Sequence, residues 1–157
     1  MFNYIWAFDI SLSNTGVAIF DLEENPQCVF SIATTSKLDH GKRLKLIADT
    51  LLGYRKLYPT NTIVLESGFS RYAASTQAIF KTVGVVNYLF SDCRQIYYAP
   101  STIKKIVGGS GRSSKEEIKS IVEKRYPMIE FADNDQSDAV GVFLCYVLDK
   151  NMDKMNK

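Results

Sequence analysis

Four carboxylates stand where a folded chain rarely places an acid: Asp9, Glu66, Asp135 and Asp138. Asp9 and Glu66 each end an apolar run of the kind that forms a buried strand. Strands are depleted in Asp, and burying a lone carboxylate is unfavourable. Asp135 and Asp138 are three residues apart at the expected start of a helix, so they share one face of it. Such placement needs a structural or a chemical reason.

The chemical reason is a metal site. If the first and fourth strands are neighbours and the last helix starts across their ends, the four carboxylates converge. Carboxylates that close repel one another, which implies raised pKa values or bound cations. Oxygen ligands without His or Cys favour Mg²⁺ or Mn²⁺. The structural alternatives are a turn or cap for Asp9, and charges complementing the helix dipole for Asp135 and Asp138.

The composition excludes several other classes of site. The single His40 and three widely spaced cysteines (Cys28, Cys93 and Cys145, with no CxxC) argue against His-based triads and zinc centres. The cysteines are expected as free thiols in a reducing compartment. No apolar run approaches the ~20 residues that cross a bilayer, and the N-terminus lacks the pattern of a signal peptide. The chain is therefore expected in the cytoplasm of a bacterial or phage-infected cell.

Basic residues gather in one stretch of the chain. The net charge is only +2, but residues 94–126 contain eight Lys and Arg against three Glu. Within this stretch, Lys104, Lys105, Arg112 and Lys115 are candidates for binding backbone phosphates, beside a Gly-rich loop at residues 108–111. Solvated helix faces are the alternative explanation. Basic and acidic patches on one small domain suit a protein that holds a polyanion and metal side by side.

The hydrophobic pattern predicts the elements that position these residues. Strands are expected at residues 4–9, 17–20, 28–34, 62–66 and 95–99, and helices at 41–58, 71–90, 101–107, 115–126 and 135–148. Three consecutive strands favour an antiparallel meander, and the later alternation favours parallel strands with crossover helices. The sequence predicts a single α/β domain over residues 1–150, with a mixed five-stranded sheet flanked by helices, and a flexible tail over 151–157.

Five pieces of sequence, in order, resemble RuvC-type Holliday-junction resolvases of the RNase H-like (retroviral-integrase) superfamily. They are Asp9 with Thr15-Gly16, Glu66 with Phe69, Pro100-Ser101-Thr102-Ile103-Lys104-Lys105 leading into Val107-Gly108-Gly109-Ser110-Gly111, Lys115, and Asp135-Gln136-Ser137-Asp138-Ala139. The resemblance covers nearly the whole chain. One departure is Asp9-Ile10-Ser11, where the family usually has Asp-Pro-Gly, which changes the loop but no ligand. The compact length favours a phage-encoded member.

The resemblance implies an RNase H-like fold and a crossover junction endonuclease. Asp9 would bridge two Mg²⁺ or Mn²⁺ ions, with Glu66, Asp135 and Asp138 completing their ligands. The substrate would be four-way and other branched DNA, cut by metal-dependent phosphodiester hydrolysis, with no small-molecule cofactor and no membrane involved. Phe69 would stack on a base unpaired at the junction, the alternative being a core aromatic.

A homodimer is expected because a four-way junction needs two symmetric cuts. The helix at residues 71–90 is the candidate interface, through Ala74, Ala78, Val85 and Val86, because it has more apolar surface than one sheet-facing side needs. Gly84 in its interior is easier to understand if a partner helix approaches closely.

Two other functions fit parts of the sequence. A non-catalytic protein that binds DNA structures needs the basic stretch but not four acids. Residues 9–16 also resemble the phosphate loop of actin-like sugar kinases, so the chain could be a fragment of such a phosphotransferase, although those enzymes need two domains of this size.

Overall fold

The computed structural model describes residues 3–67 and 73–155, with the side chains of residues 73–75 left out. The strands are β1 (Tyr4–Asp9), β2 (Asn14–Asp21), β3 (Pro26–Ala33), β4 (Thr60–Glu66) and β5 (Arg94–Tyr98). The helices are α1 (His40–Leu57), α2 (Ala73–Leu89), α3 (Pro100–Gly108), α4 (Lys115–Arg125) and α5 (Asn134–Met155). No helix in these residues combines the length and apolar character that a membrane crossing requires.

The five strands form one mixed sheet in the order β3-β2-β1-β4-β5. β1 pairs with β2, and β2 with β3, in antiparallel fashion, whereas β1–β4 and β4–β5 are parallel. The predicted α/β arrangement of a meander followed by parallel strands is confirmed. Because β1 and β4 run parallel as neighbours, the acids that end them, Asp9 and Glu66, lie at the same edge of the sheet.

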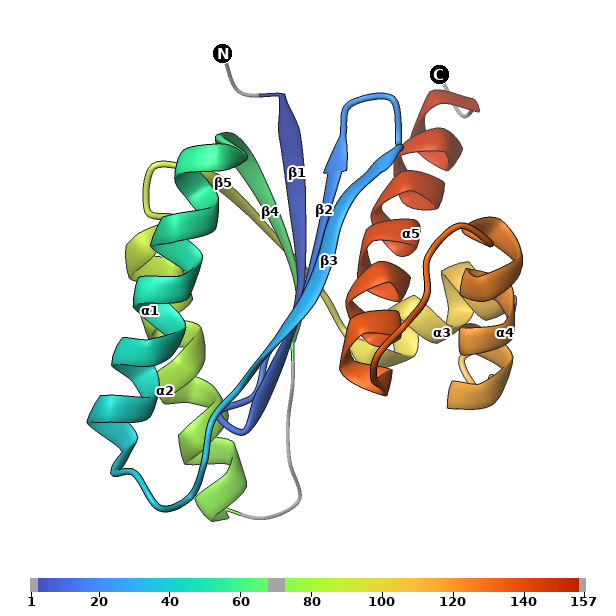
Figure 1. The fold of residues 1–157 in the computed structure, drawn as a ribbon. Coiled ribbons are helices and arrows are strands. Elements are labelled where there is room, and N and C mark those ends of the chain that lie inside the picture. Colours follow the sequence, from blue (N-terminus) through green and yellow to red (C-terminus); the bar gives the residue numbers. More distant parts are fainter. Residues whose placement is uncertain (1–2, 68–72, 156–157) are drawn as a thin grey trace.

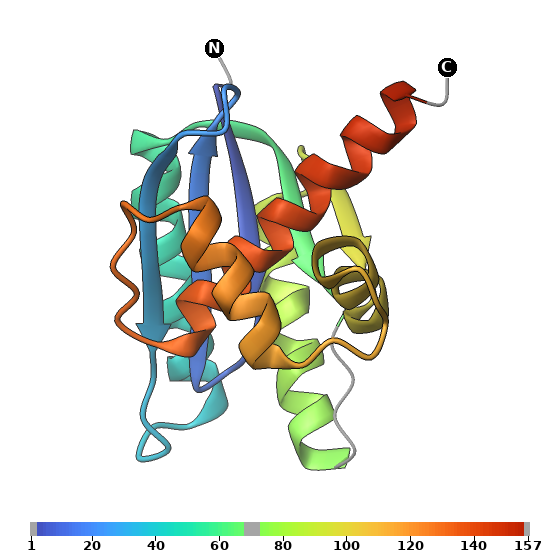
Figure 2. The ribbon, with the colours of Figure 1, turned by 90° about the vertical axis from the view of Figure 1, so that its right-hand side faces the viewer.

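Helices cover both faces of the sheet. α1 and α2 lie on one face and α3, α4 and α5 on the other (Figure 1). α5 runs obliquely across the strands, packs on β1 and β2, and is backed by α3 and α4 (Figure 2). Both layers bury apolar side chains, which explains why the central strands read as continuous hydrophobic runs.

The alternation of side chains along β1 decides which way Asp9 faces. Trp6 and Phe8 pack in the core beneath α1 and α2, whereas Ile5 and Ala7 pack in the core beneath α5. Successive side chains of a strand point to opposite faces, so Asp9 continues the α5-facing set. Glu66 faces the same way, because it is two residues after Val64, whose side chain lies in the core beneath α5.

Several element ends differ from the sequence prediction. β2 begins at Asn14 rather than at residue 17, because Asn14 already pairs with Ala33 of β3. α5 continues to Met155, through residues expected in a polar tail, since neither Gly nor Pro follows residue 148 to end it. α4 begins with a capping box, in which the Ser114 and Glu117 side chains each accept a hydrogen bond from the other residue's backbone N–H.

Candidate active site

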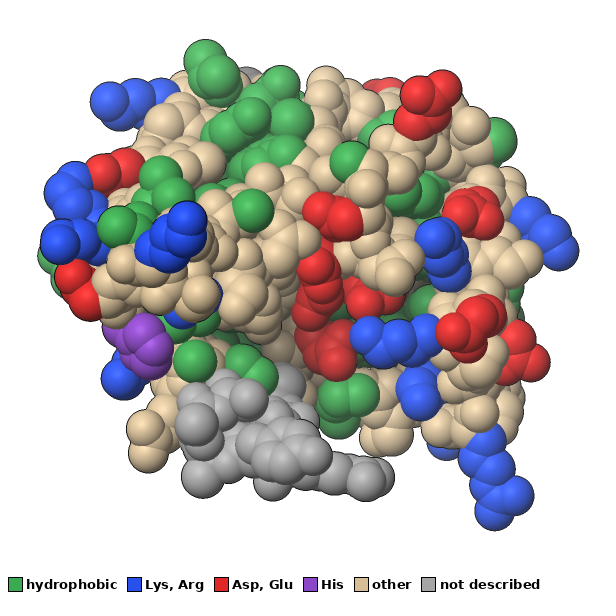
Figure 3. Space-filling view, turned by 60° about the horizontal axis from the view of Figure 1, so that its bottom comes forward, with side chains coloured by type: hydrophobic (Ala, Val, Ile, Leu, Met, Phe, Trp, Pro, Cys, Tyr) green, Lys and Arg blue, Asp and Glu red, His purple; other side chains and the backbone are tan. Residues whose placement is uncertain are grey.

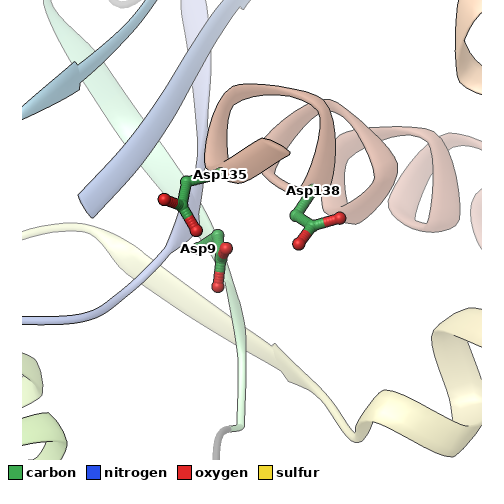
Figure 4. A group of neighbouring side chains, drawn as sticks. All are labelled: Asp9, Asp135 and Asp138. Carbon is green, nitrogen blue, oxygen red and sulfur yellow. The ribbon is translucent and has the colours of Figure 1, made fainter. Parts of the chain in front are cut away.

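Three of the four predicted acids meet where α5 begins over the end of β1. Asp9 comes from the last position of β1, Asp135 from the first turn of α5 and Asp138 from the turn that follows (Figure 4). One carboxylate oxygen from each of the three lies within 4.8 Å of the others. The convergence expected from the sequence is therefore present for these three side chains.

Gly16 makes this close approach sterically allowed. It is the register partner of Asp9 in the β1–β2 pair. A Cβ atom at this position would lie 2.0 Å from the backbone oxygen of Asp135, closer than real atoms come. The backbone of α5 therefore starts directly on the strand opposite Asp9, which explains the glycine of the Thr15-Gly16 motif.

Side-chain hydrogen bonds of Asp133 and Gln136 cap the N-terminus of α5. The Asp133 carboxylate accepts hydrogen bonds from the backbone N–H of Gln136 at 2.9 Å and from the hydroxyl of Ser31 at 2.5 Å. Gln136 in turn accepts a bond from the Ala132 N–H at 3.0 Å. These bonds fix the start of the helix on β3.

Glu66 stands beside this group and is not one of the three whose oxygens meet. With Lys104, Lys115 and Asp138 it lines a hollow of about 180 Å³ between the end of β4, α3, α4 and α5. Burial first, and then the charge of Asp138, raise the pKa of Glu66. Glu66 therefore adds its negative charge to the cluster of Asp9, Asp135 and Asp138 from the adjoining hollow.

The charges of the site are not balanced by the chain itself. Burial first, and then the charges of Asp138, Glu66 and Asp135, raise the pKa of Asp9 to about 8. Lys115 opposes it, and its Nζ lies 3.1 Å from the carboxylate of Asp138, which raises the Lys115 pKa. Clustered carboxylate oxygens with no His or Cys among them, at a site that raises the pKa values of Asp9 and Glu66, fit a hard divalent cation.

Lysines border the acids on one side. Figure 3 shows acidic side chains gathered in the middle of this face, with basic ones directly beside them. Lys104 and Lys115 line the hollow with Glu66, and Lys119 lines a second hollow of about 270 Å³ with Lys115 and Asp138. Lys119 was not among the predicted DNA-binding residues. Lys105 and Arg112 are exposed, but neither lines these two hollows.

The remaining predicted positions separate into two groups. Phe69 lies outside the described residues, as does the side chain of Ala74. Ala78 and Val85 are half-buried on α2. Val86 is 0% exposed within the core beneath α1 and α2, which contradicts its assignment to a partner-facing surface. The apolar pattern of α2 did not reveal which of its sides faces the sheet.

Asn14 was missed as a site residue. It donates one hydrogen bond to Asp135 across 121 positions of sequence. No spacing rule connects residues that far apart, so the sequence offered no signal for this contact.

The fold and the acid cluster define an RNase H-like domain with a carboxylate site for divalent metal. A family model described as "Crossover junction endodeoxyribonuclease RuvC" matches residues 7–146, so the chain belongs to the RuvC family. The family is one of divalent-metal nucleases, and the chain is an endodeoxyribonuclease of this kind.

Individual relatives agree with this assignment. The RuvC of Chloroherpeton thalassium is 30% identical over 148 residues, covering 87% of this chain and 72% of that protein. The RuvC of Ehrlichia chaffeensis is 26% identical over 151 residues, covering 93% and 97%. The structure of T. thermophilus RuvC in complex with a Holliday junction substrate superposes with a TM-score of 0.86 at 16% identity, covering 96% of each chain, which shows a shared fold.

Proposed function

We propose that this protein cuts four-way junctions and other branched DNA by hydrolysing a phosphodiester bond with two Mg²⁺ or Mn²⁺ ions per active site. The observation that carries the proposal is the meeting of Asp9, Asp135 and Asp138 oxygens within 4.8 Å, beside a row of lysines. Bound divalent cations would supply a nucleophilic water and stabilise the leaving 3′-oxygen. Cytoplasmic DNA of a bacterial or phage-infected cell would be the substrate.

The acids would divide the work of holding the ions. Asp9 is the proposed shared ligand, because its pKa is raised by Asp138, Glu66 and Asp135 alike. Glu66 completes the ligands from the side of β4, and Asp135 and Asp138 from the side of α5. Replacing any one of these carboxylates by an amide removes one negative charge from the proposed metal ligands.

The lysines would bind the DNA backbone next to the cleaved bond. Lys104 and Lys115 are the strongest candidates, because they line the same hollow as Glu66 and Asp138. Lys105 and Arg112 are proposed to reach phosphates further out, and Phe69 to stack on a base unpaired at the junction. The T. thermophilus structure, which holds a Holliday junction on a domain of this fold, supports the proposal that this chain binds DNA.

A homodimer would supply the second active site that symmetric cutting needs. The outer side of α2 supports this part of the proposal, because Phe80 and Tyr88 are 53% and 79% exposed, with Gly84 between them at helical spacing. A Cβ at Gly84 would contact nothing within 4 Å, so packing among the described residues does not explain the glycine. Ala74, Ala78 and Val85 stay candidates, and Val86 does not.

The decisive experiment is cleavage of a four-way junction made from synthetic strands, each labelled in turn. We expect paired nicks in strands of like polarity with Mg²⁺ or Mn²⁺, none in EDTA, and little cutting of a linear duplex of the same sequence. Tight junction binding without nicking in any divalent metal would favour the non-catalytic DNA-binding alternative. Membership of the RuvC family decides against the actin-like phosphotransferase alternative.

The dimer is tested separately by light scattering. We expect a mass of twice 17.7 kDa for the wild type. Tyr88→Glu places a charge on the exposed side of α2, so it should give a folded monomer that still binds Mn²⁺ but makes no paired nicks. A wild-type protein that stays monomeric on saturating junction DNA would contradict the symmetric mechanism.

A further inference from the structure

We propose that Asn14 is a positioning residue for Asp135, holding that carboxylate in place for the metal site. The inference rests on the proposed function as a metal-dependent nuclease. It concerns a neutral side chain on β2 that reaches across to the first turn of α5.

The geometry is direct. Asn14 Nδ2 donates to Asp135 Oδ2 at 2.5 Å and to Asp133 Oδ2 at 3.1 Å. An amide nitrogen carries two hydrogens, so it can serve both carboxylates at once. One side chain therefore joins the cap of α5 to the acid that follows it. Among the described residues no hydrogen bond occupies Oδ1 of Asp135, so that atom is left for a cation.

Asn14 itself is held rigidly. The Ser11 hydroxyl accepts from the Asn14 N–H and donates to the Asn14 carbonyl, both at 3.0 Å. Asn14 is also paired with Ala33 in the β2–β3 ladder. The preceding residue is fixed too, since the Thr34 N–H donates to the Ser13 carbonyl at 2.8 Å. The amide thus projects from the sheet, a more precise platform than a free loop.

A neutral donor suits this position better than a cation would. Asp9 and Asp138 repel Asp135 at this distance, and the first turn of a helix is where a chain frays most easily. A lysine at position 14 would neutralise the charge that attracts the metal. An amide hydrogen bond orients the carboxylate and leaves its charge intact, which is how outer residues commonly tune metal ligands.

The structure also offers a matched control for the capping role. Ser31 donates to the same Oδ2 of Asp133 at 2.5 Å, and among the described residues no hydrogen bond joins it to Asp135. Ser31→Ala therefore weakens the cap of α5 and leaves the Asn14–Asp135 bond in place. If Asn14 acted only through the cap, Asn14→Ala and Ser31→Ala would behave alike.

The test is titration calorimetry of Mn²⁺ into the metal-free full chain, with the thermal midpoint of each variant measured alongside. Loss of such a partner typically lowers metal affinity by about 10–100-fold, and we expect Asn14→Ala to do so. Ser31→Ala should stay within about twofold of the wild type. In an Asp135→Ala background, Asn14→Ala should have no further effect, because the carboxylate that Asn14 holds has been removed.

Each outcome decides something. Equal Mn²⁺ affinity of the wild type and Asn14→Ala, or equal losses in Asn14→Ala and Ser31→Ala, would overturn the positioning role. If Asn14→Ala folds poorly, Asn14→Leu keeps the side-chain volume; failure of both to fold would make Asn14 a structural residue and overturn the proposal. A wild type that binds no Mn²⁺, or binds it equally well as Asp9→Asn, would instead contradict the proposed function.

Discussion

Both ends of α5 carry acidic residues, but the two groups differ in how far neighbouring side chains balance their charge. At the N-terminal end, Asp135 and Asp138 meet Asp9 without enough positive charge to balance them. Along the C-terminal half, Asp149 accepts a hydrogen bond from the hydroxyl of Tyr98 at 2.7 Å. The hollow there, about 320 Å³, is larger than the one beside Glu66, yet Arg94, Lys150 and Lys154 line it together with Asp149 and Asp153.

The difference teaches which acids need something from outside the chain. Near Tyr98 the fold supplies its own partners, and Lys150 also lies over the ring of Tyr146 at 5.0 Å. Near Asp9 burial and neighbouring acids act together, so the site favours either a proton on Asp9 or a bound cation. Uncompensated charge, and not the volume of a hollow, therefore marks the candidate active site.

The largest expected contrast is in cleavage. Asp9→Asn removes the proposed shared ligand and should lower the rate of junction cleavage by about 10²–10³-fold, a loss of several kcal/mol of transition-state stabilisation. Glu66→Gln, Asp135→Asn and Asp138→Asn should also greatly reduce it. Junction binding, measured by gel shift in Ca²⁺ or EDTA, should persist because repulsion of phosphates falls.

The matched control for these variants is Asp149→Asn at the other end of α5. An asparagine oxygen can still accept the bond from Tyr98, so folding should be preserved and cleavage unchanged. Near wild-type nicking by any two of the four active-site variants would contradict the assignment of these acids as metal ligands. An equal loss of cleavage in Asp149→Asn would contradict it too.

The second contrast is in the pH dependence of stability. The pKa of Asp9 is about 8 in the folded protein against an ordinary value of 3.8. Between these values the folded state keeps a proton that the unfolded chain has released, so the free energy of unfolding falls as pH rises. For the metal-free protein in EDTA we expect a fall on the order of a few kcal/mol from about pH 4 to about pH 8.

Urea unfolding at several pH values measures this effect. Asp9→Asn should flatten the dependence because an amide does not titrate, and Glu66, whose pKa is also raised, should account for part of what is left. Asp149→Asn should keep the wild-type slope. A wild-type protein that gains stability over this pH range would show that folding does not raise the pKa of Asp9.

The sequence was sufficient for the parts of the site governed by local pattern. Strand ends and the three-residue spacing placed Asp9, Glu66, Asp135 and Asp138 correctly on their elements, and the meander order gave the sheet. The parity of Asp9 with Ile5 and Ala7 could also be counted along the chain.

What escaped prediction depends on tertiary packing. Val86 and Val85 are adjacent and equally apolar, yet only the docking of α2 on the sheet decides that Val86 is the buried one. The contact of Asn14 with Asp135 spans 121 residues, and the extent of α5 depends on support from Tyr98 for a stretch that looks like a polar tail. Such features follow from distances that no local pattern encodes.

The third contrast is between two glycines. Gly16→Ala would force its new methyl group against the backbone of Asp135, so we expect about 1–3 kcal/mol of destabilisation and weaker Mn²⁺ binding. Gly53→Ala in α1 meets nothing within 4 Å and should stabilise the protein by about 0.5–1 kcal/mol. Urea unfolding compares both variants. Equal effects would mean that the close approach of α5 to β2 is not required.

The smallest expected contrast concerns the lysines. Lys104→Ala, beside Glu66, should remove one phosphate contact and lower the slope of log affinity against log salt by about one unit, as measured by fluorescence anisotropy on a labelled junction. Lys150→Ala changes the net charge equally at the far end of α5 and should leave that slope unchanged. Lys115→Ala should show the same loss of slope. Junction binding by this variant should also depend more on divalent metal, because Lys115 offsets the charge of Asp138. Equal slopes for Lys104→Ala and Lys150→Ala would mean that the DNA responds to overall charge, and that the lysines beside the acids do not hold it.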